Sequence, residues 1–357
     1  MTRIYVRKLR MPRLWSLFLA VFFLTACSEK DDSKYEMPKF PVVTEASFEI
    51  ISDEIEGVNA ISDLWGNDKY LFLIAYDFFS KKKFHCFDIA DGKYIMSSVS
   101  AGRGPGETLS GQTLTTLQGP AMYMHDRIKK STIYFNTDSL IANGALAIRE
   151  QGTVFDDWCA FYSEIPDGRI LEVSMPTYTK IDSLGVHNRI TVYKENGDPE
   201  SSFDEYPDLD KEVLYNVYFQ AKYSVCGDRL AVGTSLGGIL ETFELGGGRI
   251  KQLGRGQFIK PVFDEKEKFK MCPYCFSDLY ATPKYIYGSF DGKLREKGVE
   301  YDDMEFSRIV VFDWRCRPVK QIQTDYSIQR IYVADEHTLY AVVEDSLSAT
   351  YLARLAI

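Results

Sequence analysis

The chain has 357 residues, of which 45% are hydrophobic and 14% aromatic, and it carries 42 Lys and Arg against 51 Asp and Glu. This composition excludes a disordered, collagen-like or multi-span membrane protein, and it fits one large or two ordinary domains. Phe and Tyr contribute 23 residues each, beside 25 Gly. Such an enrichment favours strands and tight turns over helix bundles.

Residues 1–26 differ from the rest of the chain. They contain five basic residues, no acidic residue, and an apolar run over 14–24. That run is too short to span a bilayer, which needs ~20 residues. A basic segment, a short apolar segment and small residues before a cleavage point are typical of a secretory signal peptide. We therefore exclude residues 1–26 from the folded domain.

The end of this segment, Leu24-Thr25-Ala26-Cys27, resembles the lipobox of bacterial lipoproteins. The resemblance implies that Cys27 is lipidated and becomes the first mature residue, while an ordinary signal peptide with a chance Cys is the alternative. Residues 27–44 are polar and unpatterned, as expected for a lipidated Cys on a flexible tether. The acyl chains would then attach the protein to the outer membrane. Lys30-Asp31-Asp32 resembles a surface-export signal of Bacteroides-type lipoproteins, so periplasmic and surface-exposed positions both remain open.

The mature chain is acidic. Removal of residues 1–26 takes five positive charges from a chain at −9, which leaves the mature chain at −14. An acidic body is repelled by phosphate backbones, and we find no Lys/Arg cluster that could serve as a footprint. We therefore expect no nucleic-acid partner.

Pairs of apolar, strand-like runs joined by short turns recur six times, about fifty residues apart. The turns contain Gly66-Asn67-Asp68, Pro166-Asp167-Gly168 or similar residues, which are typical of hairpins. The six predicted hairpins are 58–64 with 70–75, 114–117 with 121–124, 159–163 with 169–173, 219–225 with 229–233, 276–281 with 285–289, and 328–334 with 338–343.

Each unit also contains a third run and usually a fourth, as in 84–89 with 94–99. Four antiparallel strands per unit predict a β-propeller, for which six blades fit better than a seven-bladed ring of shorter units. The sixth unit lacks its fourth strand, and residues 45–51 form an orphan strand before the first unit. We therefore predict an all-β, six-bladed β-propeller over residues 45–357 that is closed by its N-terminal strand.

Between the first two units lies Gly102-Arg103-Gly104-Pro105-Gly106-Glu107. Together with the lipobox and the repeat, this segment resembles the TolB-like six-bladed β-propeller lipoproteins of Bacteroides-type bacteria. The resemblance covers the whole chain and implies a fold and a location more than an activity.

A shorter copy, Gly254-Arg255-Gly256, follows the fourth unit. Units one and four lie opposite each other in a six-membered ring. Arg103 and Arg255 are therefore candidates for binding a carboxylate or phosphate from opposite sides of the channel. The alternative is that these glycines only permit positive φ in a connection, since the first copy lacks the Lys-Ser/Thr of a nucleotide-binding loop.

Cys272-Pro273-Tyr274-Cys275 is identical to the redox motif of glutaredoxins, but it ends a charged stretch over 264–270 that we interpret as an insertion before unit five. The strand and helix that a redox thiolate requires are missing from this context. We predict a local Cys272–Cys275 disulfide or a coincidence of sequence. No second closely spaced Cys or His pair would complete a metal site.

Asp157 and Trp158 open the inner strand of unit three, near the predicted channel mouth, and are further candidates for ligand contact. Turn solvation and core packing are the alternatives. The four His residues have no metal or triad neighbour by spacing, so we expect no catalytic residue, metal or cofactor. Long connections over 174–186 and 290–305 predict a built-up rim.

We interpret the protein as a lipid-anchored binding or interaction module of the cell envelope for a protein partner or a glycan, and we do not expect an enzyme. The rival hypothesis is a metal-dependent, lactonase-like hydrolase with its site at the channel mouth. That hypothesis depends on analogy with other six-bladed propellers, and fold alone does not imply function.

Overall fold

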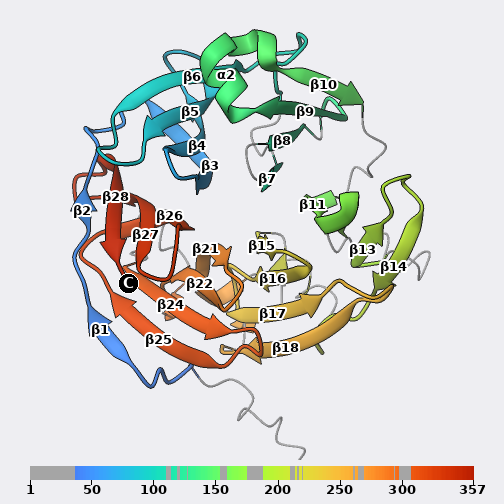
Figure 1. Cartoon of the computed structure of the whole chain (residues 1–357). Helices are drawn as coiled ribbons and strands as arrows, with labels where there is room; N and C mark the ends of the chain where they lie inside the picture. The colour runs from blue at the N-terminus through green and yellow to red at the C-terminus, as the bar shows by residue number, and fades with distance from the viewer. Residues whose placement is uncertain are drawn as a thin grey trace, which may run out of the picture.

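The computed structural model describes residues 37–109, 114–118, 121–126, 128–152, 159–174, 188–209, 214, 217–218, 220–259, 262–263, 269–292, 294–296 and 307–357. Six blades surround a central axis (Figure 1), and in each blade the strands of its own repeat are antiparallel and follow in chain order from the inside of the ring outwards. The protein is a six-bladed β-propeller, as the sequence predicts.

The blades are numbered in chain order. Blade 1 contains β3 (Val58–Gly66), β4 (Tyr70–Asp77), β5 (Lys82–Asp88) and β6 (Tyr94–Ser100), and blade 2 contains β7 (Leu114–Gln118), β8 (Ala121–Asp126), β9 (Ser131–Asn136) and β10 (Arg149–Gly152). Blade 3 contains β11 (Cys159–Ile165), β12 (Arg169–Ser174), β13 (Ile190–Tyr193) and β14 (Pro199–Phe203), and blade 4 contains β15 (Lys222–Cys226), β16 (Arg229–Gly233), β17 (Ile239–Glu244) and β18 (Lys251–Gln257). Blade 5 contains β21 (Phe276–Ala281), β22 (Tyr285–Phe290), β24 (Arg308–Asp313) and β25 (Pro318–Gln323), and blade 6 contains β26 (Ser327–Val333), β27 (Thr338–Glu344) and β28 (Thr350–Ala356).

All six predicted hairpins are present as the first two strands of the blades. Their turns use the chemistry that the sequence indicates. The side chain of Asn67 accepts hydrogen bonds from the backbone N–H groups of Lys69 and Tyr70, both at 2.9 Å. Asp167 and Gly168 both adopt φ of 70°, the left-handed conformation that Asp and Gly tolerate.

The N-terminal segment closes the ring. β2 (Glu49–Ile50) pairs antiparallel with β28 and supplies the missing fourth strand of blade 6, so the predicted closure is confirmed. β1 (Val43–Glu45) pairs parallel with β25 and adds a fifth strand to blade 5, which the sequence analysis did not predict. Between them, Phe48 is buried in the apolar cluster of blades 5 and 6.

The core consists of apolar clusters between neighbouring blades. Between blades 1 and 2, Phe72 stacks on Phe84 with ring centroids 5.5 Å apart, and both pack with Met122 and Met124. The second strands are buried on both faces, which explains why their sequences are apolar without alternation.

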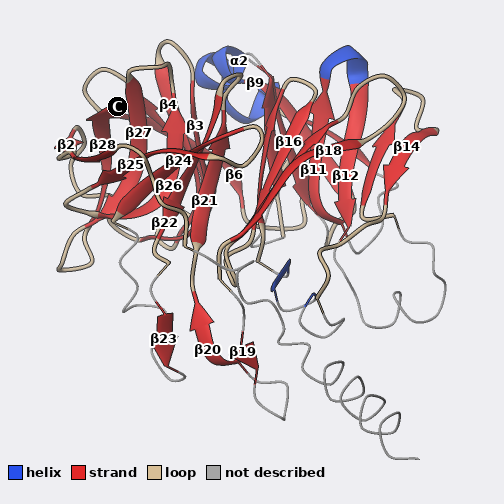
Figure 2. Cartoon of the chain, turned by 90° about the horizontal axis from the view of Figure 1, so that it is seen from below, coloured by secondary structure: helices blue, strands red, loops and turns tan. Residues whose placement is uncertain are grey.

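The connections define two faces of the disc. The turn face carries the connections between first and second strands and between third and fourth strands. The crossover face carries the connections between second and third strands and between blades. Figure 2 shows the disc from the side, with α2 (Thr137–Asn143) on the turn face.

A small sheet of β19 (Val262–Phe263), β20 (Phe269–Pro273) and β23 (Leu294–Glu296) projects from the crossover face (Figure 2). β20 pairs with both other strands. The predicted insertion before unit five and the predicted long connection of unit five therefore meet in one element. On the turn face, α2 is followed by the short helix η2 (Gly144–Ala147), and a second short helix, η3 (Pro166–Gly168), forms the first turn of blade 3. Within the described part of the chain, the helices are too short to cross a membrane.

Candidate functional site in the central channel

Four charged side chains of alternating sign come from the innermost strands of four consecutive blades. Lys222 lies on β15, Asp278 on β21, Arg330 on β26 and Asp63 on β3. Each lies three or four residues before the end of its strand, so all four lie at a similar depth. All are partly accessible to solvent. We call these four residues the channel cluster.

Two members of the channel cluster join neighbouring blades. Asp278 accepts a hydrogen bond from the backbone N–H of Ile331 in blade 6 at 2.8 Å. Arg330 donates from Nε to the carbonyl oxygen of Ser62 in blade 1 at 2.9 Å, and from a second nitrogen to the carbonyl of Ile61. These contacts lie at the junctions of blade 6 with its two neighbours, so Asp278 and Arg330 have a structural role.

The other two members make no such contact between blades. Asp63 accepts a hydrogen bond from its own neighbour, Leu64, at 2.9 Å. Among the residues that the structure describes, no partner forms a hydrogen bond or ion pair with the ammonium group of Lys222. Asp63 and Lys222 are therefore the members that can bind a ligand.

Both of these groups titrate near neutral pH. Burial, reinforced by the charge of Asp278, raises the pKa of Asp63 to about 7. Burial and the nearby charge of Arg330 lower the pKa of Lys222 to about 8. Strongly shifted pKa values inside a concave site are more frequent at functional positions than elsewhere on a protein.

Aromatic rings lie next to the charged layer. Tyr280 and Tyr332 follow Asp278 and Arg330 by two residues, so they project from the same side of their strands and lie nearer to the turn face. Their rings meet edge to face, with centroids 5.4 Å apart. Tyr280 remains partly accessible to solvent. Charged groups beside a partly accessible tyrosine suit a sugar or a peptide.

The Gly-Arg-Gly-Pro-Gly-Glu loop is held by carboxylates of this chain. The N–H of Gly104 donates to Glu107 at 2.7 Å, and that of Gly106 donates to Glu150 at 2.8 Å. Lys129 donates to the carbonyls of Gly104 and Glu107 at 2.9 and 2.8 Å. These backbone N–H groups are already paired with carboxylates, which supports the structural interpretation of the motif. The side chain of Arg103 is exposed.

Arg255 has an internal partner. It lies on β18, the outermost strand of blade 4, and its Nε donates to Glu241 at 2.8 Å. Glu241 is fully buried and also pairs with Arg189, which lies over the rings of Tyr206 and Tyr218 at 4.5 and 4.8 Å. Although burial opposes it, the charge of Arg189 keeps the pKa of Glu241 low. Arg255 thus pairs, from a partly exposed position, with a buried cluster between blades 3 and 4.

The predicted convergence of Arg103 and Arg255 on the channel is therefore corrected. Arg103 follows β6 and Arg255 lies on β18, and both strands are the outermost of their blades, on opposite parts of the ring (Figure 1). A connection between blades starts at an outermost strand and reaches the axis only at its far end. A residue near its start therefore stays away from the channel.

The structure does not test the other candidate site residues that the sequence indicates. Cys27, Asp157 and Trp158 lie outside the described residues, as does the side chain of Cys272. Cys275 is buried, and its backbone N–H donates to Ser235 at 2.8 Å. The described residues contain no group of three or more His, Cys, Asp or Glu side chains that could hold a metal ion. The metal-dependent hydrolase therefore has no supporting observation among them.

Sequence reasoning missed the channel cluster. Its members belong to no motif and lie far apart in the chain. The available signal was positional, because each is a charged residue shortly before the first turn of its repeat. Alignment of the six units by their turns places Asp63, Asp278 and Arg330 at one position, with Lys222 one residue away.

Comparisons with known proteins agree with the fold. A family model described as TolB-like 6-blade propeller-like matches residues 66–336. Among solved structures, a candidate exported protein from Bacteroides fragilis has a TM-score of 0.57 at 10% identity, covering 90% of this chain and 98% of that one. The PQQ-bound aldose sugar dehydrogenase from Streptomyces coelicolor has a TM-score of 0.49 at 10% identity, covering 88% and 98%. At 10% identity, the likeness to the exported protein concerns the fold alone. No curated protein matches the chain.

Proposed function

We propose that this chain, which belongs to the TolB-like six-bladed propeller family, is a lipid-anchored binding module of the cell envelope that holds a glycan or a segment of a partner protein in its channel. The observation that carries the proposal is the pair Asp63 and Lys222. Both are partly accessible in the channel, and neither joins one blade to another. Charged groups placed in this way are available to a ligand.

The chemistry of the cluster suits a ligand rich in hydroxyl or amide groups. The carboxylate of Asp63 accepts hydrogen bonds from hydroxyl or N–H groups, and the ammonium of Lys222 donates to hydroxyl or carbonyl oxygens. Tyr280 offers an aromatic ring to a sugar or an apolar side chain. When Asp63 is ionised, two positive and two negative charges compensate each other, so the channel favours ligands without a large net charge.

The location is inferred from the N-terminal sequence. The signal peptide and the lipobox motif at Cys27 support an outer membrane lipoprotein. A structure with the same fold, from Bacteroides fragilis, is described as a candidate exported protein, which is consistent with a place in the envelope. Incorporation of labelled palmitate into the expressed chain, and its loss in Cys27→Ser, tests the anchor.

The binding site is tested with isosteric variants of the mature chain. A glycan array and a pull-down from envelope extracts first identify the ligand of the wild-type protein. Asp63→Asn and Lys222→Met should each weaken its binding about tenfold or more, because a hydrogen bond to a charged group is lost.

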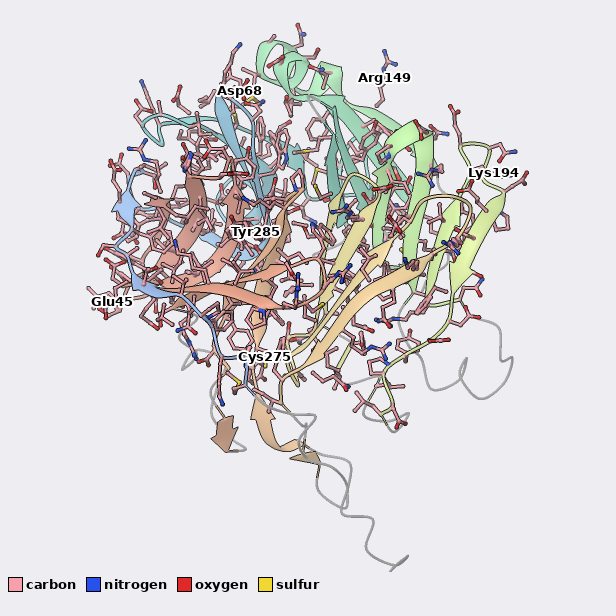
Figure 3. All side chains as sticks on the ribbon, turned by 60° about the horizontal axis from the view of Figure 1, so that its bottom comes forward. Glu45, Asp68, Arg149, Lys194, Cys275 and Tyr285 are labelled. Carbon is pink, nitrogen blue, oxygen red and sulfur yellow. The ribbon has the colours of Figure 1, made fainter. Side chains whose placement is uncertain are left out.

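Matched controls come from the exposed turn between β13 and β14. Asp198→Asn and Lys194→Met make the same chemical changes at the outer rim, where Figure 3 shows Lys194. Both controls should bind the ligand as tightly as the wild type. Equal affinities for the channel variants and the controls would rule out the channel as the binding site.

A further inference from the structure

Large exposed apolar side chains gather on three neighbouring blades at the crossover face. Leu347 is 86% exposed between β27 and β28, Phe78 and Phe79 are 51% and 78% exposed between β4 and β5, and Ile128 is 64% exposed between β8 and β9. Each connection joins the second strand of its blade to the third, so all of them lie on the same face. Blades 6, 1 and 2 are adjacent in the ring (Figure 1). We call these four side chains the apolar tips.

The same turn presents the tips in all three blades. An Asp at or just after the end of the second strand accepts a hydrogen bond from the backbone N–H two residues later. The pairs are Asp77 with Phe79 at 2.7 Å, Asp126 with Ile128 at 2.9 Å and Asp345 with Leu347 at 2.8 Å. A repeated Asp-x-apolar turn holds an apolar residue at each tip, although exposure of a large apolar side chain is unfavourable in water.

Met37, the first residue that the structure describes, lies on the same face. Met37 lies beside Gly292, in the connection after the second strand of blade 5, where a Cβ on Gly292 would lie 2.9 Å from the Met37 side chain. The residues between Cys27 and Met37 span at most ~35 Å when fully extended. A lipidated Cys27 would therefore keep Met37, and the crossover face beside it, within this distance of the bilayer, a step that rests on the lipid anchor of the proposed function.

We propose that the apolar tips insert into the interfacial region of a lipid bilayer, so that the crossover face lies on the membrane. Lys81 lies over the rings of Tyr76 and Phe78 at 5.7 and 5.8 Å, where its ammonium can reach headgroup phosphates. Arg103 is exposed in the next connection, whose Ala101 N–H donates to the carbonyl of Lys81. The turn face, at which the channel also opens, then points away from the bilayer.

Apolar contact, rather than charge, distinguishes this surface. The connection between β2 and β3 also belongs to the crossover face, and it carries the exposed acids Asp53, Glu54 and Glu56. The face is therefore not uniformly positive. Insertion of the tips should tolerate salt, because screening weakens attraction between charges and leaves apolar burial intact.

The experiment uses the full mature chain with Cys27→Ser, so that no acyl chain contributes. The protein is floated with vesicles of phosphatidylethanolamine and phosphatidylglycerol at low and high salt. The unsubstituted tips should give co-flotation at both salt concentrations. The double variant Phe79→Ser/Leu347→Ser should bind the vesicles more weakly, by about tenfold for each side chain removed. Unchanged melting temperatures would show that the variants remain folded.

Tyr94→Ser is the matched control. Tyr94 is 52% exposed, but it begins β6 directly after a turn on the opposite face. This variant should float like the parent. Absence of co-flotation by the parent chain, or an equal loss in Tyr94→Ser, would overturn the proposal. So would a tip variant that keeps its vesicle binding and loses an envelope protein from its pull-down, because the tips would then contact a protein.

Palmitate labelling of Cys27 and ligand binding by the channel variants are separate measurements. Failure of either would count against the proposed function, whereas flotation of the Cys27→Ser chain tests the tips alone.

Discussion

The guanidinium group of Arg330, in the last blade, donates a hydrogen bond to the carbonyl oxygen of Ser62, in the first blade, at 2.9 Å. The two residues are 268 positions apart in the chain. Their contact, together with that of Arg330 and Ile61, holds the inner end of the junction where the ring closes. β2 and β28 hold its outer end.

Replacement of this arginine should loosen the closed ring. Arg330→Met leaves two partly buried carbonyl oxygens without their donor and removes the positive charge between Asp63 and Asp278. We expect the free energy of unfolding in urea to fall by about 2–4 kcal/mol. The control is Arg354→Met, which removes an exposed ion pair with Glu49 in the same blade and should cost less than about 1 kcal/mol. Equal losses in the two variants would contradict this role of Arg330.

The buried pair of Arg189 and Glu241 should matter more than ion pairs at the surface. Glu241→Gln leaves the fully buried guanidinium of Arg189 without its counter-charge, and we expect a loss of about 3–5 kcal/mol in urea unfolding. Glu200→Gln removes a more exposed partner, which lies 3.4 Å from Arg169, and should cost less than about 1 kcal/mol. A small loss for Glu241→Gln would mean that water reaches this cluster.

Asp63 should make stability depend on pH. Its pKa rises from 3.8 to about 7 on folding, so the folded state binds the proton more tightly than the unfolded state does. The wild type should therefore lose stability relative to Asp63→Asn as the pH rises from about 4 to about 7. Melting temperatures of both proteins across this range measure the effect, and we expect the variant to melt at least about 2 °C higher at pH 8. Parallel curves would show that Asp63 is solvated like a surface carboxylate.

The N-terminal segment should contribute to stability through one aromatic residue. Phe48 is buried between blades 5 and 6, and its N–H donates to Asp325 at 3.0 Å. Phe48→Ala should cost about 3–5 kcal/mol by creating a cavity. Val43→Ala, at an exposed position of β1, should change the free energy of unfolding by less than about 0.5 kcal/mol. A small effect of Phe48→Ala would indicate that the ring stays closed without this segment.

The fold was predictable because its signals are local and repeated. Each hairpin combines apolar runs with a turn of Gly, Asn, Asp or Pro, and six copies at similar spacing identify a propeller. The missing fourth strand of the last unit made closure by residues 45–51 predictable as well. Helix α2 was missed because seven residues contain too little helical periodicity, although Asn136 caps it by accepting from the Ser139 N–H at 3.0 Å.

The site was less predictable, because its residues meet only in the ring. Asp63 and Asp278 are single charges in otherwise ordinary strands, and only closure of blade 1 on blade 6 brings them together. The glycines around Arg103 and Arg255 suggested a binding loop, but both residues lie at outermost strands, away from the axis. The Asp-x-apolar turns become visible only when the blades are compared at equivalent positions.

The pairing of Glu49 with Arg354 limits the order in which the polypeptide can fold. β2 precedes all six blades in the chain, and its partner strand β28 follows all the other described strands. Loop closure over such a separation is slow compared with hairpin formation. The blades can therefore form one after another, while β1 and β2 have no partner strand until β25 and β28 are made. The ring can close only once β28 is present, so a product truncated before β28 would keep β2 unpaired and the last blade incomplete.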